Sequence, residues 1–167
     1  MKLREAIHGT VLIIICWLPL TGAADYERAD HVIINKSDRK ILLMKDDRIL
    51  KTAGIMLGLA PTGHKTEEGD FRTPEGNYRL TKRNSSSDFF LSILIDYPNA
   101  EDTRRAKTRG VSPGGQIMIH GQPNDPTHSI DYYRMTDWTN GCIAVSNSDM
   151  VDIWLLTTPD TPIEILP

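Results

Sequence analysis

The 167-residue chain contains only two cysteines, Cys16 and Cys142. Small secreted domains that depend on disulfides carry many paired cysteines, so a disulfide framework is excluded as the basis of this fold. Cys16 lies in an apolar stretch near the N-terminus, and Cys142 is the only cysteine in the rest of the chain. An unpaired thiol is typical of a reactive nucleophile, an intermolecular bridge or a buried structural side chain.

Long hydrophobic runs are also scarce. The run over residues 10–20 is interrupted by Pro19 and is shorter than the roughly 20 apolar residues of a membrane-spanning helix. It follows a short basic start and precedes the small residues Thr-Gly-Ala-Ala at 21–24. This order predicts a secretory signal peptide over residues 1–24, with a retained anchor as the alternative. We expect a single domain over residues 25–167, located in the periplasm or secreted.

The chain has no large excess of charge of either sign. Its 19 Lys and Arg residues against 22 Asp and Glu residues give a net charge of −3. This mild acidic balance excludes the basic footprint of a nucleic-acid-binding protein. The close Cys and His pairs of zinc sites are absent as well, so we expect no metal and no cofactor.

Short β-like runs dominate what is present. Residues 31–35, 40–44 and 48–57 are apolar runs separated by polar turns, which predicts a three-stranded meander. Further strands are expected over residues 77–82, 91–96, 116–120 and 163–166.

Helical signals are few. Residues 99–108 carry helix formers and end at Gly110, and residues 150–156 follow a start signal at Ser146. The polar segment 122–138 is expected to be a long loop, and such loops are often functional. The sequence therefore predicts a mostly β fold with one or two short helices.

Cys142 has a histidine within folding reach. A thiol attacks as its thiolate and needs a partner that accepts its proton, most often histidine. His120 ends a predicted strand and is followed by Gly121, where the chain can turn and place the imidazole in a cleft. An ordinary histidine at a strand end is the alternative, because a single Cys and His pair is not specific.

The glycine before the cysteine adds to this pattern. Gly141 has no Cβ, so the backbone can approach a substrate carbonyl closely. The amide of Cys142 and a neighbouring amide can then donate to an oxyanion, each worth roughly 3 kcal/mol in the transition state. A glycine that merely closes a turn is the alternative. Trp138, Tyr132 and Tyr133 belong either to the core or to a cleft wall.

Several ordered motifs resemble one known family. Residues 119–121 (Ile-His-Gly) and 139–143 (Thr-Asn-Gly-Cys-Ile) resemble the His-Gly and Ser/Thr-His-Gly-Cys signature of the L,D-transpeptidase (YkuD) domain. Residues 68–78 resemble its Gly-Asp-x-x-Thr-Pro-x-Gly-x-Tyr/Phe segment. The resemblance extends from about His31 to the C-terminus, and it implies a β-sandwich of mixed sheets with one or two short helices.

The resemblance implies a cysteine acyltransferase that acts on diaminopimelate-containing peptidoglycan stem peptides. Cys142 is then the nucleophile and His120 the base, and the backbone of Gly141 and Cys142 supplies the oxyanion donors. The predicted substrate-binding residues are Gly121, Thr139, Trp138 and Arg134. For Arg134 the expectation rests on the fit between a guanidinium and a carboxylate, and a surface role is the alternative.

Two positions depart from the family pattern. Asn140 stands where the family usually has histidine, and Ala144 stands where it usually has arginine. Asparagine forms hydrogen bonds but does not titrate, so a proton-carrying role is not transferred to Asn140. The segment is most similar to a YafK-like subgroup, which is linked to hydrolytic release of an envelope lipoprotein. Transpeptidation, hydrolysis with water as acceptor, and a non-catalytic wall-binding module therefore stand as three alternatives.

Overall fold

The computed structural model describes residues 27–167, so the predicted signal peptide and Cys16 lie outside the described residues. The strands are β1 (His31–Asn35), β2 (Lys40–Lys45), β3 (Arg48–Gly54), β4 (Gly76–Ser87), β5 (Phe90–Ile95), β6 (Met118–His120), β7 (Ile143–Ala144) and β8 (Pro162–Leu166). The helices are α1 (Ala100–Arg109), α2 (Ile130–Met135) and α3 (Asn147–Leu156). The predicted mostly β fold is confirmed, and the described residues contain three helices where one or two were expected.

The strands form one mixed sheet in the order β3-β2-β1-β8-β4-β5-β6-β7. The meander β1-β2-β3 is antiparallel, as predicted, and β8 lies parallel to β1. Asp46 and Asp47 form the two-residue turn between β2 and β3, and both have positive φ, at 47° and 61°. Two left-handed residues match the twist of a tight hairpin, which explains this pair of acidic residues without a catalytic role.

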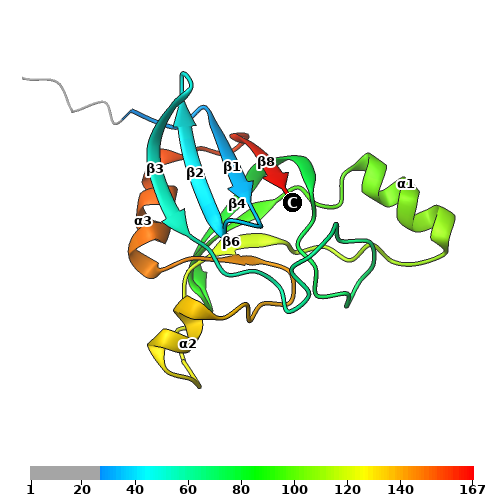
Figure 1. Ribbon diagram of the computed structural model, residues 1–167. Coiled ribbons are helices and arrows are strands. Elements are labelled where there is room, and N and C mark those ends of the chain that lie inside the picture. The colour runs from blue at the N-terminus through cyan, green and yellow to red at the C-terminus, as the bar shows by residue number, and fades with distance from the viewer. Residues whose placement is uncertain (1–26) are drawn as a thin grey trace, which may run out of the picture.

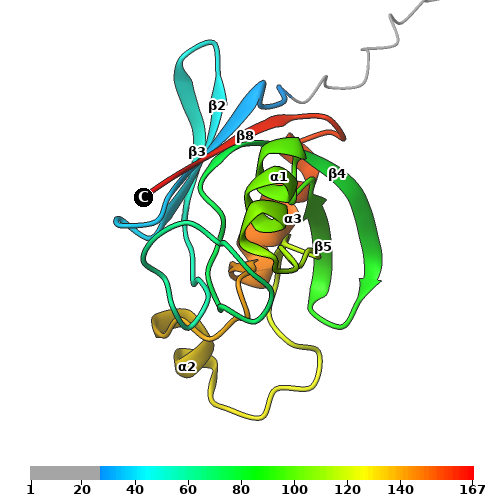
Figure 2. The ribbon, with the colours of Figure 1, turned by 90° about the vertical axis from the view of Figure 1, so that its right-hand side faces the viewer.

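Strand β4 joins the two halves of the sheet. Residues 76–79 pair with β8, whereas β4 from Leu80 onwards pairs with β5 through two register irregularities. Figure 2 shows β4 curving from the β8 side of the molecule to its hairpin with β5. The strands that carry the candidate site, β6 and β7, follow β5 in the sheet and are parallel to each other.

The helices occupy different places around this sheet. Helix α3 packs on β5 and buries Met150 and Ile153, whereas α1 projects from the strands at one side of the molecule (Figure 1). Helix α2 lies within the segment 122–138 that was expected to be loop, and begins where the Ser129 side chain accepts from the Tyr132 amide. No helix among residues 27–167 has the length and apolar character needed to cross a membrane.

Candidate active site

The register of β6 and β7 places Cys142 and His120 on the same face of the sheet. Ile119 pairs with Ile143 and His120 pairs with Ala144 in this parallel ladder. Side chains alternate between faces along a strand, so residues two apart share a face. Cys142 directly precedes β7, and its side chain therefore lies on the face that carries the His120 imidazole.

The His120 imidazole is held in its neutral form. Its Nδ1 lies 2.8 Å from the Gly121 carbonyl oxygen, which accepts only, so Nδ1 carries the proton and Nε2 is left as an acceptor. The ring is 2% exposed and packs against Phe89 and Trp138, with centroids 4.6 and 5.6 Å away. This burial lowers the pKa of His120 to about 4, so the imidazole is uncharged near neutral pH.

The cysteine is held as a thiol. The Cys142 Sγ donates to the Gln116 carbonyl oxygen at 3.5 Å. Burial raises the pKa of Cys142, and the Met118 amide and the Lys65 charge oppose this effect without overcoming it. A neutral thiol and a neutral imidazole on one face suit a mechanism in which the proton leaves sulfur during attack.

Thr139 closes the turn that presents the cysteine. Its Oγ1 accepts from the Gly141 amide at 3.1 Å and donates to the Cys142 carbonyl oxygen at 2.7 Å. Asn140 is exposed at the tip of this turn and forms no hydrogen bond with another residue of the described chain. The Cys142 amide likewise has no acceptor among residues 27–167. The Gly141 amide is already bonded in this state, so its oxyanion role stays a prediction.

Two glycines let three backbone segments meet behind the cysteine turn. A Cβ on Gly58 would overlap the Phe71 carbonyl oxygen and lie 2.9 Å from the Gly141 nitrogen. Gly141 has a φ of +123°, and a Cβ there would lie 2.6 Å from the Arg72 carbonyl oxygen. The Gly-Asp-Phe-Arg-Thr-Pro segment therefore packs directly against the backbone that positions Cys142.

Asp70 organises that supporting segment. Its carboxylate accepts from the Lys65 Nζ at 2.8 Å and from the amides of Thr66, Glu67 and Arg72. Burial acts to raise the pKa of Asp70, but the ammonium and the three amides outweigh it and lower the pKa. The loop that contacts Gly141 is thus fixed by a charged and fully bonded carboxylate.

The other predicted site residues fall into two groups. Trp138 packs against the His120 ring, and the Gly121 carbonyl oxygen accepts the hydrogen bond from His120. Trp138 and Gly121 therefore surround the imidazole. Thr139 belongs to the turn that carries Cys142. Arg134 lies on α2 at a cavity of about 800 Å³ whose lining includes neither Cys142 nor His120. The structure does not bring Arg134 to the cysteine.

Several residues around the site were not predicted from the sequence. Phe89, Gln116 and Lys65 contact or influence His120 and Cys142 only through long-range packing, and no local pattern marks them. Asp70 lay inside a motif that indicated the family, but its structural role became visible only in the fold. No group of three or more His, Cys, Asp or Glu side chains in the described part of the chain is arranged to hold a metal ion.

The chain is similar to known proteins in sequence. The model of the L,D-transpeptidase catalytic domain (YkuD) matches residues 29–165. The Escherichia coli K12 protein named "Putative L,D-transpeptidase YafK" is 33% identical over 104 residues, covering 61% of this chain and 36% of that protein.

Solved structures show the same fold. The helical cell shape determining protein Pgp2 from Campylobacter jejuni has a TM-score of 0.59 at 28% identity, covering 80% of this chain and 46% of that one. An L,D-transpeptidase from Xylanimonas cellulosilytica has a TM-score of 0.54 at 17% identity, covering 84% and 62%. The chain thus spans less than half of the Escherichia coli and Campylobacter proteins. The family match covers nearly all described residues, and the chain belongs to the L,D-transpeptidase catalytic-domain (YkuD) family.

Proposed function

We propose that the chain is an exported cysteine acyltransferase that acts on peptidoglycan stem peptides through a Cys142 acyl-enzyme. The observation that carries the proposal is the state of His120. Its Nδ1 is bound to the Gly121 carbonyl, and its free Nε2 is uncharged on the same face as the thiol. Membership of the L,D-transpeptidase family supplies the substrate class.

The reaction follows from these two groups. The Cys142 Sγ attacks a peptide carbonyl carbon while His120 Nε2 accepts the thiol proton. The unbonded Cys142 amide is the first candidate donor to the resulting oxyanion. Collapse of this intermediate breaks the C–N bond, and the imidazolium returns its proton to the leaving amine. A thioester on Cys142 remains, and an acceptor releases it.

Two acceptors fit the second step. An amine acceptor gives a cross-linked peptide, and water gives a trimmed stem or releases an attached envelope lipoprotein. Asn140 supports water as the acceptor. It is exposed and does not titrate, and it stands where the family usually has histidine. The similarity to the YafK protein points to the same subgroup. Both proposed reactions proceed through the same acyl-enzyme, and both act on the cell wall and so require a location outside the cytoplasm. A non-catalytic wall-binding module is the remaining alternative.

Mass spectrometry of the protein mixed with a disaccharide-tetrapeptide tests the proposal. We expect an adduct with the mass of the peptide lacking its terminal residue, and none on Cys142→Ala. His120→Gln should slow adduct formation by about 100-fold or more, since it removes the general base. Trimmed product indicates water as acceptor, and dimeric product indicates an amine. Absence of adduct and of both products in the wild-type protein refutes the enzymatic proposal and favours the binding module.

A further inference from the structure

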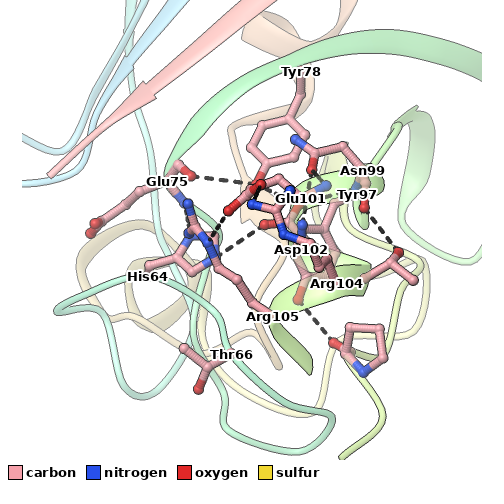
Figure 3. Close-up of polar contacts among 12 residues, drawn as sticks. His64, Thr66, Glu75, Tyr78, Tyr97, Asn99, Glu101, Asp102, Arg104 and Arg105 are labelled. Atoms are coloured by element: carbon pink, nitrogen blue, oxygen red, sulfur yellow. Dashed lines mark hydrogen bonds and ion pairs between the residues drawn. The ribbon is translucent and has the colours of Figure 1, made fainter. Parts of the chain in front are cut away.

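A second cavity lies between α1 and the segment 64–66, away from the residues that surround His120. It has a volume of about 380 Å³, and we call it the α1 pocket. Figure 3 shows several of the side chains that line it, among them His64, Arg104 and Arg105. Its helix wall carries Arg104, Arg105 and Arg109, and Tyr97 also lines the cavity. Neither the proposed acyl transfer nor the family motifs in the sequence assign a role to these arginines.

The guanidinium groups in this pocket have unused donors. Arg104 and Arg105 share the single carboxylate of Glu101, and Arg105 uses only its Nε, at 2.8 Å. The Nη1 and Nη2 atoms of Arg105 have no acceptor among residues 27–167. The nearest Arg109 nitrogen lies 3.6 Å from the Glu67 carboxylate, beyond a good hydrogen bond. The pocket therefore retains N–H groups that an incoming anion can bind.

The buried acid of the pocket does not compete for these donors. Asp102 is 5% exposed, and its oxygens already receive the Tyr78 hydroxyl at 2.9 Å and the Asn99 amide at 3.1 Å. His64 Nε2 lies 3.2 Å from the other Asp102 oxygen, and its Nδ1 accepts from the Glu75 amide (Figure 3). These contacts tie the start of α1 to the loop and fix the wall that carries the arginines.

One loop connects the α1 pocket to the cysteine. Lys65 lines the pocket, binds Asp70, and is close enough to Cys142 to lower its pKa. A few residues later the same loop packs the Phe71 carbonyl against Gly58. The loop that forms one wall of the pocket therefore also supports the backbone of the cysteine turn, through the Arg72 carbonyl oxygen next to Gly141.

We propose that the α1 pocket binds a carboxylate of the peptide whose carbonyl Cys142 attacks. This inference rests on the proposed function and adds a subsite to it. A planar guanidinium with two free N–H groups fits a carboxylate in a bidentate geometry, which a lysine does not provide. The Tyr97 ring supplies an apolar wall for the carbon atoms beside that carboxylate.

Calorimetric titration of the Cys142→Ala protein tests the subsite without chemistry. The probes are an acidic stem tetrapeptide and its analogue with every carboxylate converted to carboxamide. We expect Arg105→Gln to raise the Kd of the acidic peptide about tenfold, because a charge-assisted hydrogen bond is lost, and to leave the carboxamide unchanged. Lys107→Gln is the matched control, since Lys107 is exposed on the same helix and does not line the pocket. It should change the Kd less than twofold.

The outcomes separate the subsite from the proposed function. Equal weakening by Lys107→Gln and Arg105→Gln indicates a general charge effect and overturns the subsite, as does an unchanged Kd in Arg105→Gln. An active wild-type enzyme with an unchanged KM in Arg105→Gln overturns the subsite alone. Arg105-dependent binding without any acyl-enzyme in the wild-type protein overturns the proposed function alone. Thermal unfolding of each variant checks that the helix remains folded.

Discussion

The cysteine turn, residues 139–142, and helix α1 are both supported by the loop over residues 64–72, but the protein holds them in different ways. The turn is fixed by backbone atoms in contact, with glycines where no Cβ fits. Helix α1 is fixed by its capping residues and by side-chain contacts of Asp102 with His64 and of Arg109 with Glu67. Close backbone contact holds the Cys142 backbone in one position that tolerates little change, whereas the side-chain contacts of α1 tolerate more substitutions.

The largest expected effect comes from disrupting the backbone contacts that hold the cysteine turn. A methyl group on Gly58 overlaps the Phe71 carbonyl oxygen, which belongs to a rigid backbone segment and cannot move aside cheaply. We expect Gly58→Ala to lower the free energy of unfolding on the order of 4 kcal/mol and to abolish acyl-enzyme formation. Urea denaturation and mass spectrometry measure the two effects.

Gly54→Ala is the matched control for this variant. A Cβ on Gly54 meets no atom within 4 Å, and its φ lies outside the left-handed region. We expect its free energy of unfolding to stay within about 0.5 kcal/mol of the wild type. Similar losses in both variants contradict the claim that close backbone approach defines the turn.

The next largest effect is a pH dependence of folding stability that arises from the buried His120 beside the cysteine turn. Burial lowers the pKa of His120 to about 4 in the folded protein from an ordinary value of 6.5. Between these values the unfolded chain binds a proton that the folded protein does not, so folding stability falls as the pH drops from 6.5 to 4. The loss is about 3 kcal/mol at 1.36 kcal/mol per pKa unit. Above pH 6.5 this loss of stability does not occur, and below pH 4 it reaches its full value and no longer grows.

Denaturation curves at several pH values test this dependence. The His120→Gln variant lacks the titrating ring, so its stability should fall less over the same interval, by about the amount assigned to His120. The exposed ion pairs of α1 contribute equally to both proteins and cancel in this difference. A wild-type slope retained in His120→Gln contradicts the assignment of the buried imidazole as the pH-sensitive group.

The smallest effect concerns α1. The Asn99 side chain accepts from the amides of Glu101 and Asp102 and caps the helix. We expect Asn99→Ala to lower the free energy of unfolding by about 1 kcal/mol, with acyl-enzyme formation at Cys142 nearly unchanged. Asn99→Asp retains the cap and serves as the control. Loss of acylation in Asn99→Ala but not in Asn99→Asp, measured where both variants are folded, contradicts this expectation. It shows that α1 and the cysteine turn are more tightly coupled than their contacts indicate.

Local patterns in the sequence were sufficient for much of the fold. Short apolar runs separated by polar turns predicted the β1-β2-β3 meander, and Gly110 marked the end of α1 as expected. Strand β4 extends beyond the predicted residue 82 because its polar second half forms backbone hydrogen bonds with β5. This half has no alternation of apolar residues, so the sequence pattern does not predict it. Helix α2 was missed because six residues in a polar segment leave little periodic signal.

The candidate site divides in the same way. Cys142 and His120 could be predicted as candidate site residues because a lone thiol near a histidine is rare and their motifs are local, and the structure places both on one face of the sheet. The contacts of Gly58, Phe71 and Arg72 join positions that are distant in the sequence, and only the folded chain brings them together. Arg134 was predicted from its charge alone. The charge of a side chain does not determine which cavity it lines, and Arg134 lines a cavity that includes neither Cys142 nor His120.

The backbone bridge between Met56 and Ala144 has a consequence for folding. It hydrogen-bonds the chain just after β3 to β7, the opposite edge strand of the sheet, through bonds of 2.8 and 2.9 Å. Contacts between such distant positions close large loops and form slowly. We therefore expect the surroundings of Cys142 to assemble late in folding, and we expect the thiol to be exposed until they do. We expect the Cys142 thiol to be most open to unwanted disulfide exchange before this bridge forms.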